Sequence, residues 1–156
     1  MSETVQIDAI DRRILAELQA DAAISHADLA QRVGSSSASV WRRIRAMENA
    51  GLLNGAIRTV DAARLGYGVN VICNIRVRSH SADDRANFES FVRSRPEILE
   101  CFSMSGEWDY LLRVVARDVA DYEAFLMRTL LNHPSVATAS SHFALSLTKH
   151  VTALPV

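Results

Sequence analysis

The fold of this chain is organised around the stretch Ser103-Met104-Ser105-Gly106-Glu107-Trp108-Asp109-Tyr110-Leu111-Leu112. An apolar run leads into this stretch, and a second apolar run continues from Tyr110 to Ala116. Gly106 permits a positive φ, and Asp109 is a residue type that suits turns. The stretch therefore predicts a tight turn between two strands. From its chemistry alone it is an ordinary hairpin, so any further role depends on the sequence around it.

The residues on either side of this turn predict a domain with the order β-α-β-β-α-β, a ferredoxin-like split sandwich. Apolar and polar residues alternate from Val69 to Val77, a period of two that indicates a strand. Ser81 and Asp118 are typical N-caps, and each precedes a segment with helical apolar spacing. The other expected strands are residues 98–104, 110–116 and 136–148.

The sheet face that the two helices leave free is also expected to be apolar. Its candidate residues are Ile72, Phe102, Met104, Leu111 and Val115. An exposed apolar patch of this kind marks an interface. A stable interface typically buries roughly 800 Å² per partner. The sequence therefore predicts a homodimer in which two sheets pack back to back.

Three short helices are predicted upstream of this domain. The first spans Ala9–Ala20, where isoleucine and leucine recur at helical spacing. The second follows an N-cap at Ser25 and ends at Gly34, and the third follows Ser36 and ends at Gly51. A short helix, a tight glycine turn and a longer helix form a helix-turn-helix.

The third helix is predicted to bury Val40, Ile44 and Met47 and to face DNA with its other side. Arginine can bond guanine at two atoms, and serine can contact phosphate or base. The expected DNA contacts are Ser36, Ser37, Ser39, Trp41, Arg42, Arg43 and Arg45. By itself this could be an ordinary solvated face, but the preceding short capped helix and the wing expected after the third helix together favour the DNA-binding interpretation. Trp41 could instead pack on the first helix or on a partner subunit.

A wing is expected directly after the third helix. Residues 52–60 predict a strand, a turn at Asn54-Gly55 and a second strand, because Asn-Gly is typical of two-residue hairpins. The chain is thus an α+β protein with three expected parts. These are a winged DNA-binding domain at residues 1–60, a hinge at 61–66 and a ferredoxin-like oligomerisation domain at 67–156.

The composition gives a formal net charge of -1 over 156 residues, so the chain as a whole has no basic excess. Residues 32–58 nevertheless contain five arginines against one acid, Glu48, which is a local basic patch. No signal peptide is evident, and the longest uncharged run, residues 129–148, contains proline, histidine and serines. Cys73 and Cys101 have no metal-ligand spacing and are expected to be reduced. We therefore expect a cytoplasmic protein without cofactor or metal.

Three parts of the chain share motifs with one known family. They are residues 7–18 of the first helix, residues 29–34 with Arg43, Ile44, Glu48 and Gly51 of the helix-turn-helix, and the turn Gly106-Glu107-Trp108-Asp109-Tyr110. With these motifs the chain resembles the Lrp/AsnC, or feast/famine, family of bacterial and archaeal transcription regulators. The resemblance implies DNA-binding dimers that associate further, often into octameric rings, and a C-terminal domain that binds an effector.

The resemblance also implies that an amino acid binds between dimers, near the Gly-x-x-Asp-Tyr turn and the last strand. The residues carried over are Met104, Ser105, Gly106, Asp109, Tyr110, Ser140 and His142. Backbone N–H groups around Gly106 could bind a carboxylate, and Asp109 could accept an ammonium group. Asp109 could equally cap the turn, and His142 could lie in a subunit interface. Residues 140–156 resemble a family branch that responds to cysteine, which makes cysteine one expected effector.

One departure and two alternatives remain. Ser35 stands where the family usually has a leucine-like residue, which is expected to weaken packing between the second and third helices. An enzyme with Cys101 or His142 as catalyst is one alternative, but neither residue has an evident partner for nucleophilic chemistry, so no enzymatic activity is expected. A nucleoid-architecture protein with little sequence preference would share every feature above, and base substitutions in its DNA target would distinguish it.

Overall fold

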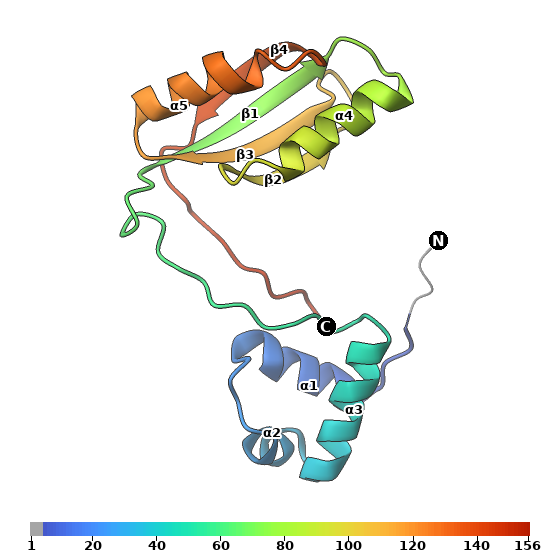
Figure 1. Cartoon of the computed structure of the whole chain (residues 1–156). Coiled ribbons are helices and arrows are strands. Elements are labelled where there is room, and N and C mark those ends of the chain that lie inside the picture. Colours follow the sequence, from blue (N-terminus) through green and yellow to red (C-terminus); the bar gives the residue numbers. More distant parts are fainter. Residues whose placement is uncertain (1–4) are drawn as a thin grey trace. The chain divides into compact units, whose positions relative to one another are not determined.

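The computed structural model describes residues 5–156 and divides the chain into two compact units (Figure 1). The helical unit consists of the residues up to Thr59 together with Lys149–Val156, and the sheet unit consists of Val60–Thr148. Each unit has its own hydrophobic core. By their contacts the last eight residues belong to the helical unit, whereas the sequence analysis placed them in the second domain.

The helical unit contains three helices at the predicted places. They are α1 (Ala9–Ala20), α2 (His26–Val33) and α3 (Ser37–Asn49). Each helix is preceded by a side chain that accepts hydrogen bonds from backbone N–H groups of the first turn, namely Asp8, Ser25 and Ser36. α2 ends at Gly34, whose φ of 69° lies in the left-handed region that glycine adopts without strain.

The core of the helical unit lies where the three helices meet. Ile14 of α1, Leu29 of α2 and Val40 of α3 are fully buried there. Ser35, in the turn between α2 and α3, is half-buried, and its N–H donates to the carbonyl oxygen of Ala30 at 2.9 Å. The backbone of this turn therefore continues the C-terminal cap of α2 with a serine at this position.

The wing prediction was wrong. Residues 52–60 contain no strand, and their backbone runs on without forming a hairpin. A two-residue Asn-Gly hairpin requires positive φ at both turn residues. Gly55 does not adopt a positive φ, although Gly51 just before it does, with a φ of 68°. An isolated two-stranded ribbon is marginally stable in water, and residues 52–60 have no third strand to pair with.

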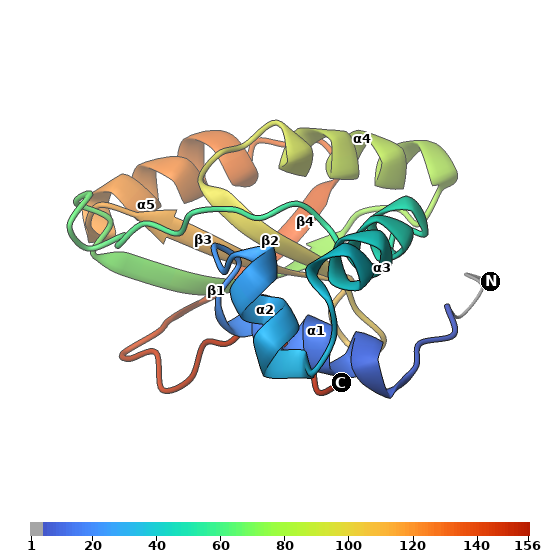
Figure 2. The ribbon, with the colours of Figure 1, turned by 90° about the horizontal axis from the view of Figure 1, so that it is seen from below.

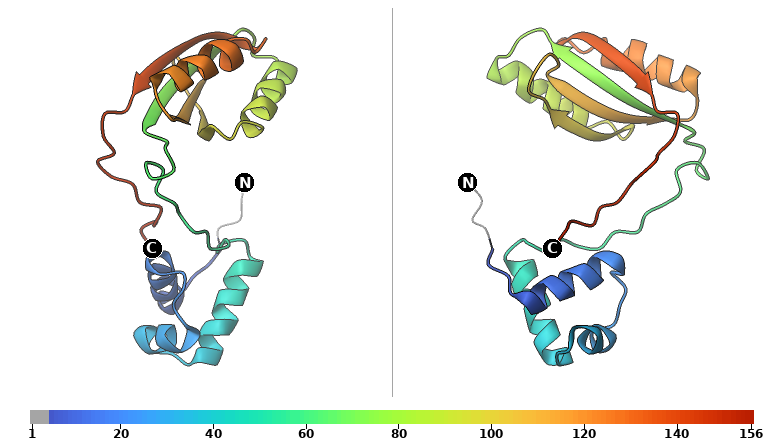
Figure 3. Two further views of the ribbon diagram at one scale, coloured as in Figure 1. Left: turned by 60° about the vertical axis from the view of Figure 1, so that its left-hand side comes forward. Right: turned by 180° about the vertical axis from the view of Figure 1, so that it is seen from behind.

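The sheet unit has the predicted β-α-β-β-α-β order. Its elements are β1 (Val69–Val77), α4 (Ala82–Arg93), β2 (Ile98–Ser103), β3 (Tyr110–Ala116), α5 (Val119–Phe125), η1 (Leu126–Leu130) and β4 (Val136–Phe143). The strands form one antiparallel sheet in the order β2-β3-β1-β4. Both helices lie on the same face of this sheet, as Figures 2 and 3 show.

Two segments of the sheet unit differ from prediction. The last strand was expected to continue to residue 148, but β4 ends at Phe143. Its final pairing is the hydrogen bond from the N–H of Ala144 to the oxygen of Asn70, and β1 begins only at Val69, so no partner remains for the following residues. The second helix widens at its end into the π-helical turn η1, in which the N–H of Leu131 donates to the oxygen of Leu126.

The strand register separates the two faces of the sheet. Val71, Cys73 and Ile75 point into the core beneath the helices and are fully buried. We call the opposite side the open face. One cross-strand row on it runs through Phe102, Leu111, Asn74 and Ser140, and the next runs through Glu100, Arg113, Ile72 and His142.

The open face is partly apolar, as predicted. Phe102 is 51% exposed and Met104 is 43% exposed, while Leu111 is half-buried. An ion pair of 2.9 Å between Arg113 and Glu100 interrupts the apolar surface. Val115, which was also expected there, is buried at the end of β3, where its N–H donates to the oxygen of Glu97.

Candidate functional site

The exposed side of α3 carries the first candidate site. Val40, Ile44 and Met47 are buried as predicted, so the opposite side of the helix faces solvent. Trp41 is 50% exposed, and the guanidinium carbon of Arg45 lies 5.8 Å from the centre of its ring. Trp41 therefore does not pack into the core of the helical unit. It forms an exposed cation–π pair on the same side as the arginine.

The polar residues at the start of α3 are divided between capping and exposure. The hydroxyl of Ser36 accepts a hydrogen bond from the N–H of Ser39 at 3.2 Å, so its oxygen already serves as the helix cap. Ser37 is exposed and Ser39 is half-buried. Arg42 is exposed, and among the described residues no carboxylate lies within ion-pair distance of it. The guanidinium group of Arg42 is thus available to an external anion.

Arg43 does not belong with these outward-facing residues, which corrects the sequence prediction. Its Nη1 donates to Oδ2 of Asp8 at 2.7 Å and to Oδ1 of Asp11 at 2.8 Å, and its side chain is only 26% exposed. Hydrogen bonds to Asp11 and Asp8 raise the pKa of Arg43. The backbone N–H of Asp11, followed by Arg43, lowers the pKa of Asp8. Arg43 therefore joins α3 to α1, and its guanidinium group is already paired with two carboxylates.

The turn between β2 and β3 is the second candidate site, and its conformation is as predicted. Gly106 has a φ of 121°, a backbone angle that residues with a side chain rarely adopt. The N–H of Met104 donates to the oxygen of Asp109 at 2.8 Å and closes the turn. Oδ2 of Asp109 accepts the N–H of Val77 at 2.8 Å, and Oδ1 lies 3.6 Å from Nδ1 of His80. The carboxylate of Asp109 is thus already occupied by the end of β1.

Arg76 on β1 holds this turn, a contact that sequence reasoning missed. Its guanidinium donates to the carbonyl oxygen of Glu107 through two nitrogens at 3.3 and 3.1 Å, and to Oε1 of Glu107 at 3.1 Å. It also lies 5.1 Å from the centre of the Trp108 ring. The alternation of β1 places Arg76 on the open face, but no local signal links it to residues 31 positions away.

The predicted effector residues on β4 lie together on the open face. The hydroxyl of Ser140 is 3.3 Å from Nε2 of His142; Ser140 is half-buried and His142 is exposed. Asn74 and Ile72 of β1 lie beside them in the strand register. Ser140, His142 and Asn74 form a polar corner of the open face, and Ile72 lies beside it.

Tyr110 lies on the other side of the sheet from Ser140 and His142. It is buried, its ring packs 4.8 Å from that of Phe88, and its hydroxyl donates to Oε1 of Glu89 at 3.4 Å. The predicted effector set is therefore divided between the two faces of the sheet, and Tyr110 does not join the polar corner.

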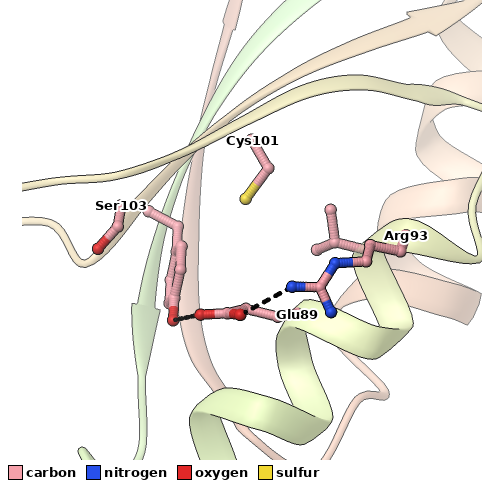
Figure 4. Close-up of a pocket in the computed structure, with 6 residues that line it drawn as sticks. Glu89, Arg93, Cys101 and Ser103 are labelled. Atoms are coloured by element: carbon pink, nitrogen blue, oxygen red, sulfur yellow. Dashed lines mark hydrogen bonds and ion pairs between the residues drawn. The ribbon is translucent and has the colours of Figure 1, made fainter. Parts of the chain in front are cut away.

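A cavity of about 320 Å³ lies beside Tyr110 on the helix side of the sheet (Figure 4). Its lining comes from α4, β2 and β3 and consists of Glu89, Val92, Arg93, Cys101, Ser103 and Tyr110. Glu89 and Arg93 form an ion pair of 3.1 Å at its rim. Burial raises the pKa of Cys101, so its thiol is protonated at neutral pH and is a poor nucleophile.

The two cysteines are both free. Cys73 lies on β1 and Cys101 on β2, and β3 separates these strands in the sheet. The strands that carry the two cysteines are therefore not neighbours in the sheet. No helix within residues 5–156 is both long enough and apolar enough to cross a membrane.

Two family profiles match the two units in turn. The AsnC-type helix-turn-helix domain matches residues 7–48, and the Lrp/AsnC ligand binding domain matches residues 70–154. The chain belongs to the Lrp/AsnC family. This Lrp/AsnC protein is accordingly a DNA-binding transcriptional regulator with a separate ligand-binding domain, as the sequence predicts.

Curated relatives and solved structures agree with this assignment. The Lrp/AsnC chain is 33% identical over 150 residues to the DNA-binding transcriptional activator DecR of Escherichia coli K12, covering 96% of this chain and 99% of DecR. It is 39% identical over 140 residues to the Bkd operon transcriptional regulator of Pseudomonas aeruginosa, covering 90% and 92% of the two chains.

Among solved structures, the regulator NMB0573 of Neisseria meningitidis in complex with L-Met superposes with a TM-score of 0.92 at 33% identity, covering 96% of this chain and 97% of that one. An AsnC family regulator of Agrobacterium tumefaciens gives a TM-score of 0.90 at 40% identity, with the same coverage of both chains. The likeness therefore extends over both units.

Proposed function

We propose that this Lrp/AsnC protein reads specific DNA sequences with α3 and that a small amino acid, bound by the sheet unit, changes its affinity for DNA. The observation that carries the DNA part is the exposed side of α3, where Arg42, Arg45 and Trp41 face solvent. Arg42 has the reach and the hydrogen-bond donors to contact a guanine edge or a phosphate. No catalytic role is part of this proposal, and we place the protein in the cytoplasm.

Single substitutions on α3 test the DNA proposal. Arg42→Ala should weaken binding to the specific site by about 1 to 3 kcal/mol if the residue reads a base. Arg128→Ala is the matched control, because Arg128 is an exposed arginine in η1 of the sheet unit. Footprinting and fluorescence anisotropy at physiological salt measure the effect. Equal losses for both variants would indicate bulk electrostatic attraction and would end the proposed role of Arg42.

The number of binding modules follows from the symmetry of a dimer. Two copies related by a two-fold axis would present two α3 helices to successive major grooves about 34 Å apart. We therefore propose that the DNA target is a pseudo-palindrome and that a homodimer is the DNA-binding species, which assembles further into a larger ring such as an octamer. A footprint with two protected half-sites one helical turn apart supports this arrangement.

The effector is proposed to be an amino acid held near the turn at Gly106 and the polar corner at Ser140 and His142. The L-Met complex of the neisserial regulator NMB0573 supports an amino acid as the class of ligand. The hydroxyl of Ser140 and the imidazole of His142 are 3.3 Å apart and offer one hydrogen-bonding group each on the open face. Asp109 contributes by fixing the end of β1, because its carboxylate is already hydrogen-bonded to Val77.

A thermal-shift screen of the twenty standard amino acids, with cysteine and methionine among them, tests this part. A ligand that binds only the folded protein raises the unfolding temperature by mass action. The shift should disappear in Ser140→Ala and His142→Ala and persist in Ser103→Ala, which alters the cavity on the other side of the sheet. If Ser103→Ala abolishes the shift and the β4 variants retain it, the ligand binds in that cavity.

An architectural DNA-binding protein with low sequence preference is the second candidate function, because the same basic helix serves either role. Base substitutions in the footprinted site distinguish the two. A specific regulator loses about 1 to 3 kcal/mol of binding free energy for each mismatched base pair, whereas an architectural protein loses little.

A further inference from the structure

The C-terminal tail, Lys149–Val156, returns to the helical unit although it follows the last strand of the sheet unit. Residues 144–148 connect it to β4, which ends at Phe143. The helical unit is therefore reached by the chain twice, once through residues 50–68 and once through this tail. Residues 50–68 are the covalent link between α3 and β1, which the order of the two units requires. The tail, in contrast, has no part in the function proposed above.

One side chain holds the tail. Nε2 of Gln19 donates to the carbonyl oxygen of Leu154 at 3.1 Å, and Oε1 of Gln19 accepts the N–H of Leu154 at 2.7 Å. Gln19 lies in the last turn of α1 and is half-buried. A primary amide is the side-chain group that can satisfy both backbone groups of one residue at once. The contact thus fixes the position and the direction of the tail.

The side chain of Leu154 takes no part in this contact, since the residue is 72% exposed. Val151 is also largely exposed. The tail therefore gains little from apolar burial, and its docking rests mainly on the two hydrogen bonds of Gln19. The net free energy of two such bonds is of the same order as the cost of ordering a few residues. The docked and released tails are consequently close in free energy, which makes the contact reversible.

We propose that Gln19 and the tail form a reversible latch that couples β4 to α1. The latch is a second tether on the DNA-binding helices, and it narrows the range of positions that the helical unit can take while it is closed. A change at β4, such as a ligand bound at the polar corner of Ser140 and His142, shifts the balance between closed and released tails. The latch itself rests on the geometry above, and its effect on DNA rests on the proposed function.

The sequence supplies a probe for the latch. Lys149, the first residue of the tail, is the only lysine in the chain. A protease that cuts after lysine can therefore cleave the intact protein at one place only, and release of the tail lets the chain around Lys149 enter the protease active site more readily. Cleavage of the folded full-length protein, followed by mass spectrometry, reports the released fraction when opening and closing are fast.

Gln19→Ala should accelerate this cleavage about tenfold, and Gln31→Ala, the same change on α2, should leave the rate unchanged. Gln19→Glu should fall between wild type and Gln19→Ala, because a carboxylate can still accept the N–H of Leu154 but cannot donate to its oxygen. Hydrogen exchange at residues 150–156 should follow the same order. Equal cleavage rates for wild type and Gln19→Ala would overturn the latch.

A second measurement tests the coupling. Gln19→Ala, and a chain that ends at Lys149, should bind a DNA with two half-sites several-fold more weakly than wild type does. Two helical units that are free of their tails lose more conformational freedom when both bind at once. Both variants should bind a DNA with a single half-site as tightly as wild type does. If cleavage changes while both affinities stay the same, the tail docks but does not act on DNA. If wild type binds no DNA at all, the proposed function fails, and the cleavage result still decides whether the latch exists.

Discussion

Arg43 of α3 and Asp11 of α1 are joined by a hydrogen bond of 2.8 Å between Nη1 and Oδ1. The same nitrogen donates to Asp8, which caps α1. The adjacent Arg42 is exposed, and the described residues provide it with no carboxylate partner. Two neighbouring arginines of one helix therefore have different surroundings, because a step of one residue turns the side chain by about 100° around the helix axis.

Substitution of these two arginines should separate stability from DNA binding. Arg43→Ala should lower the free energy of unfolding by about 1 kcal/mol, because a hydrogen-bonded pair between helices is lost. Arg42→Ala should change it by less than about 0.5 kcal/mol, as is usual for an exposed side chain. Urea unfolding followed by circular dichroism measures both. The assigned roles are wrong if Arg42→Ala is the more destabilising of the two.

Asp109 gives a second prediction, which concerns the turn. Asp109→Ala leaves the N–H of Val77 without its partner at the end of β1, and we expect a loss of about 1 to 2 kcal/mol in unfolding free energy. Glu107→Ala is the control, since the side chain of Glu107 is exposed and Arg76 still binds its carbonyl oxygen. If Asp109→Ala is as stable as wild type but loses effector binding, the carboxylate contacts the ligand directly.

The open face should be the dimer interface. Phe102→Asp places a charge in the middle of its exposed apolar surface, and we expect the dimer to dissociate into protomers, as measured by light scattering after size exclusion. Met127→Asp is the matched control on the helix side, where Met127 is 56% exposed. Dissociation by Met127→Asp with an intact Phe102→Asp dimer would move the interface to the helix side.

The stability of the sheet unit should depend on pH through His133. Burial, and then the charge of Arg95, lower the pKa of His133 below its ordinary value of 6.5. Its ring packs 4.5 Å from that of Phe91, and its Nδ1 accepts the N–H of Ser135 at 3.3 Å. A histidine with a depressed pKa stabilises the fold while it is neutral, so this contribution is complete above pH 6.5 and is lost as the pH falls through the folded-state pKa.

His133→Gln should remove that part of the pH dependence. The difference in unfolding free energy between wild type and this variant should decrease as the pH is lowered from 7 towards 5. The other histidines are present in both proteins and cancel in the difference. A difference that stays constant with pH would show that His133 does not titrate in this range.

Local patterns were sufficient for most of the fold. The caps at Ser25 and Ser36 and the alternation over Val69–Val77 predicted where the elements begin, because these signals act over a few residues. The wing failed for a physical reason, since Asn54-Gly55 is a hairpin signal only where the flanking strands have a partner. The end of β4 depended likewise on where β1 begins.

The candidate site was less predictable, because its contacts join distant residues. Arg76 and Glu107 are 31 positions apart, and Gln19 and Leu154 are 135 apart. Helical spacing placed Arg42 and Arg45 on the exposed side of α3. The same spacing did not show that Arg43 meets two carboxylates of another helix, which only the packing of α1 against α3 determines.

Gly55 has a further consequence. It has no positive φ, and a Cβ atom added there would meet nothing within 4 Å. Alanine or a bulkier residue would therefore fit, and it would restrict the backbone of the segment that joins the helices to the sheet. The stiffness of this connecting segment can therefore be adjusted at one position without a change in the fold of either unit. Such a substitution would alter how freely the DNA-binding helices can move.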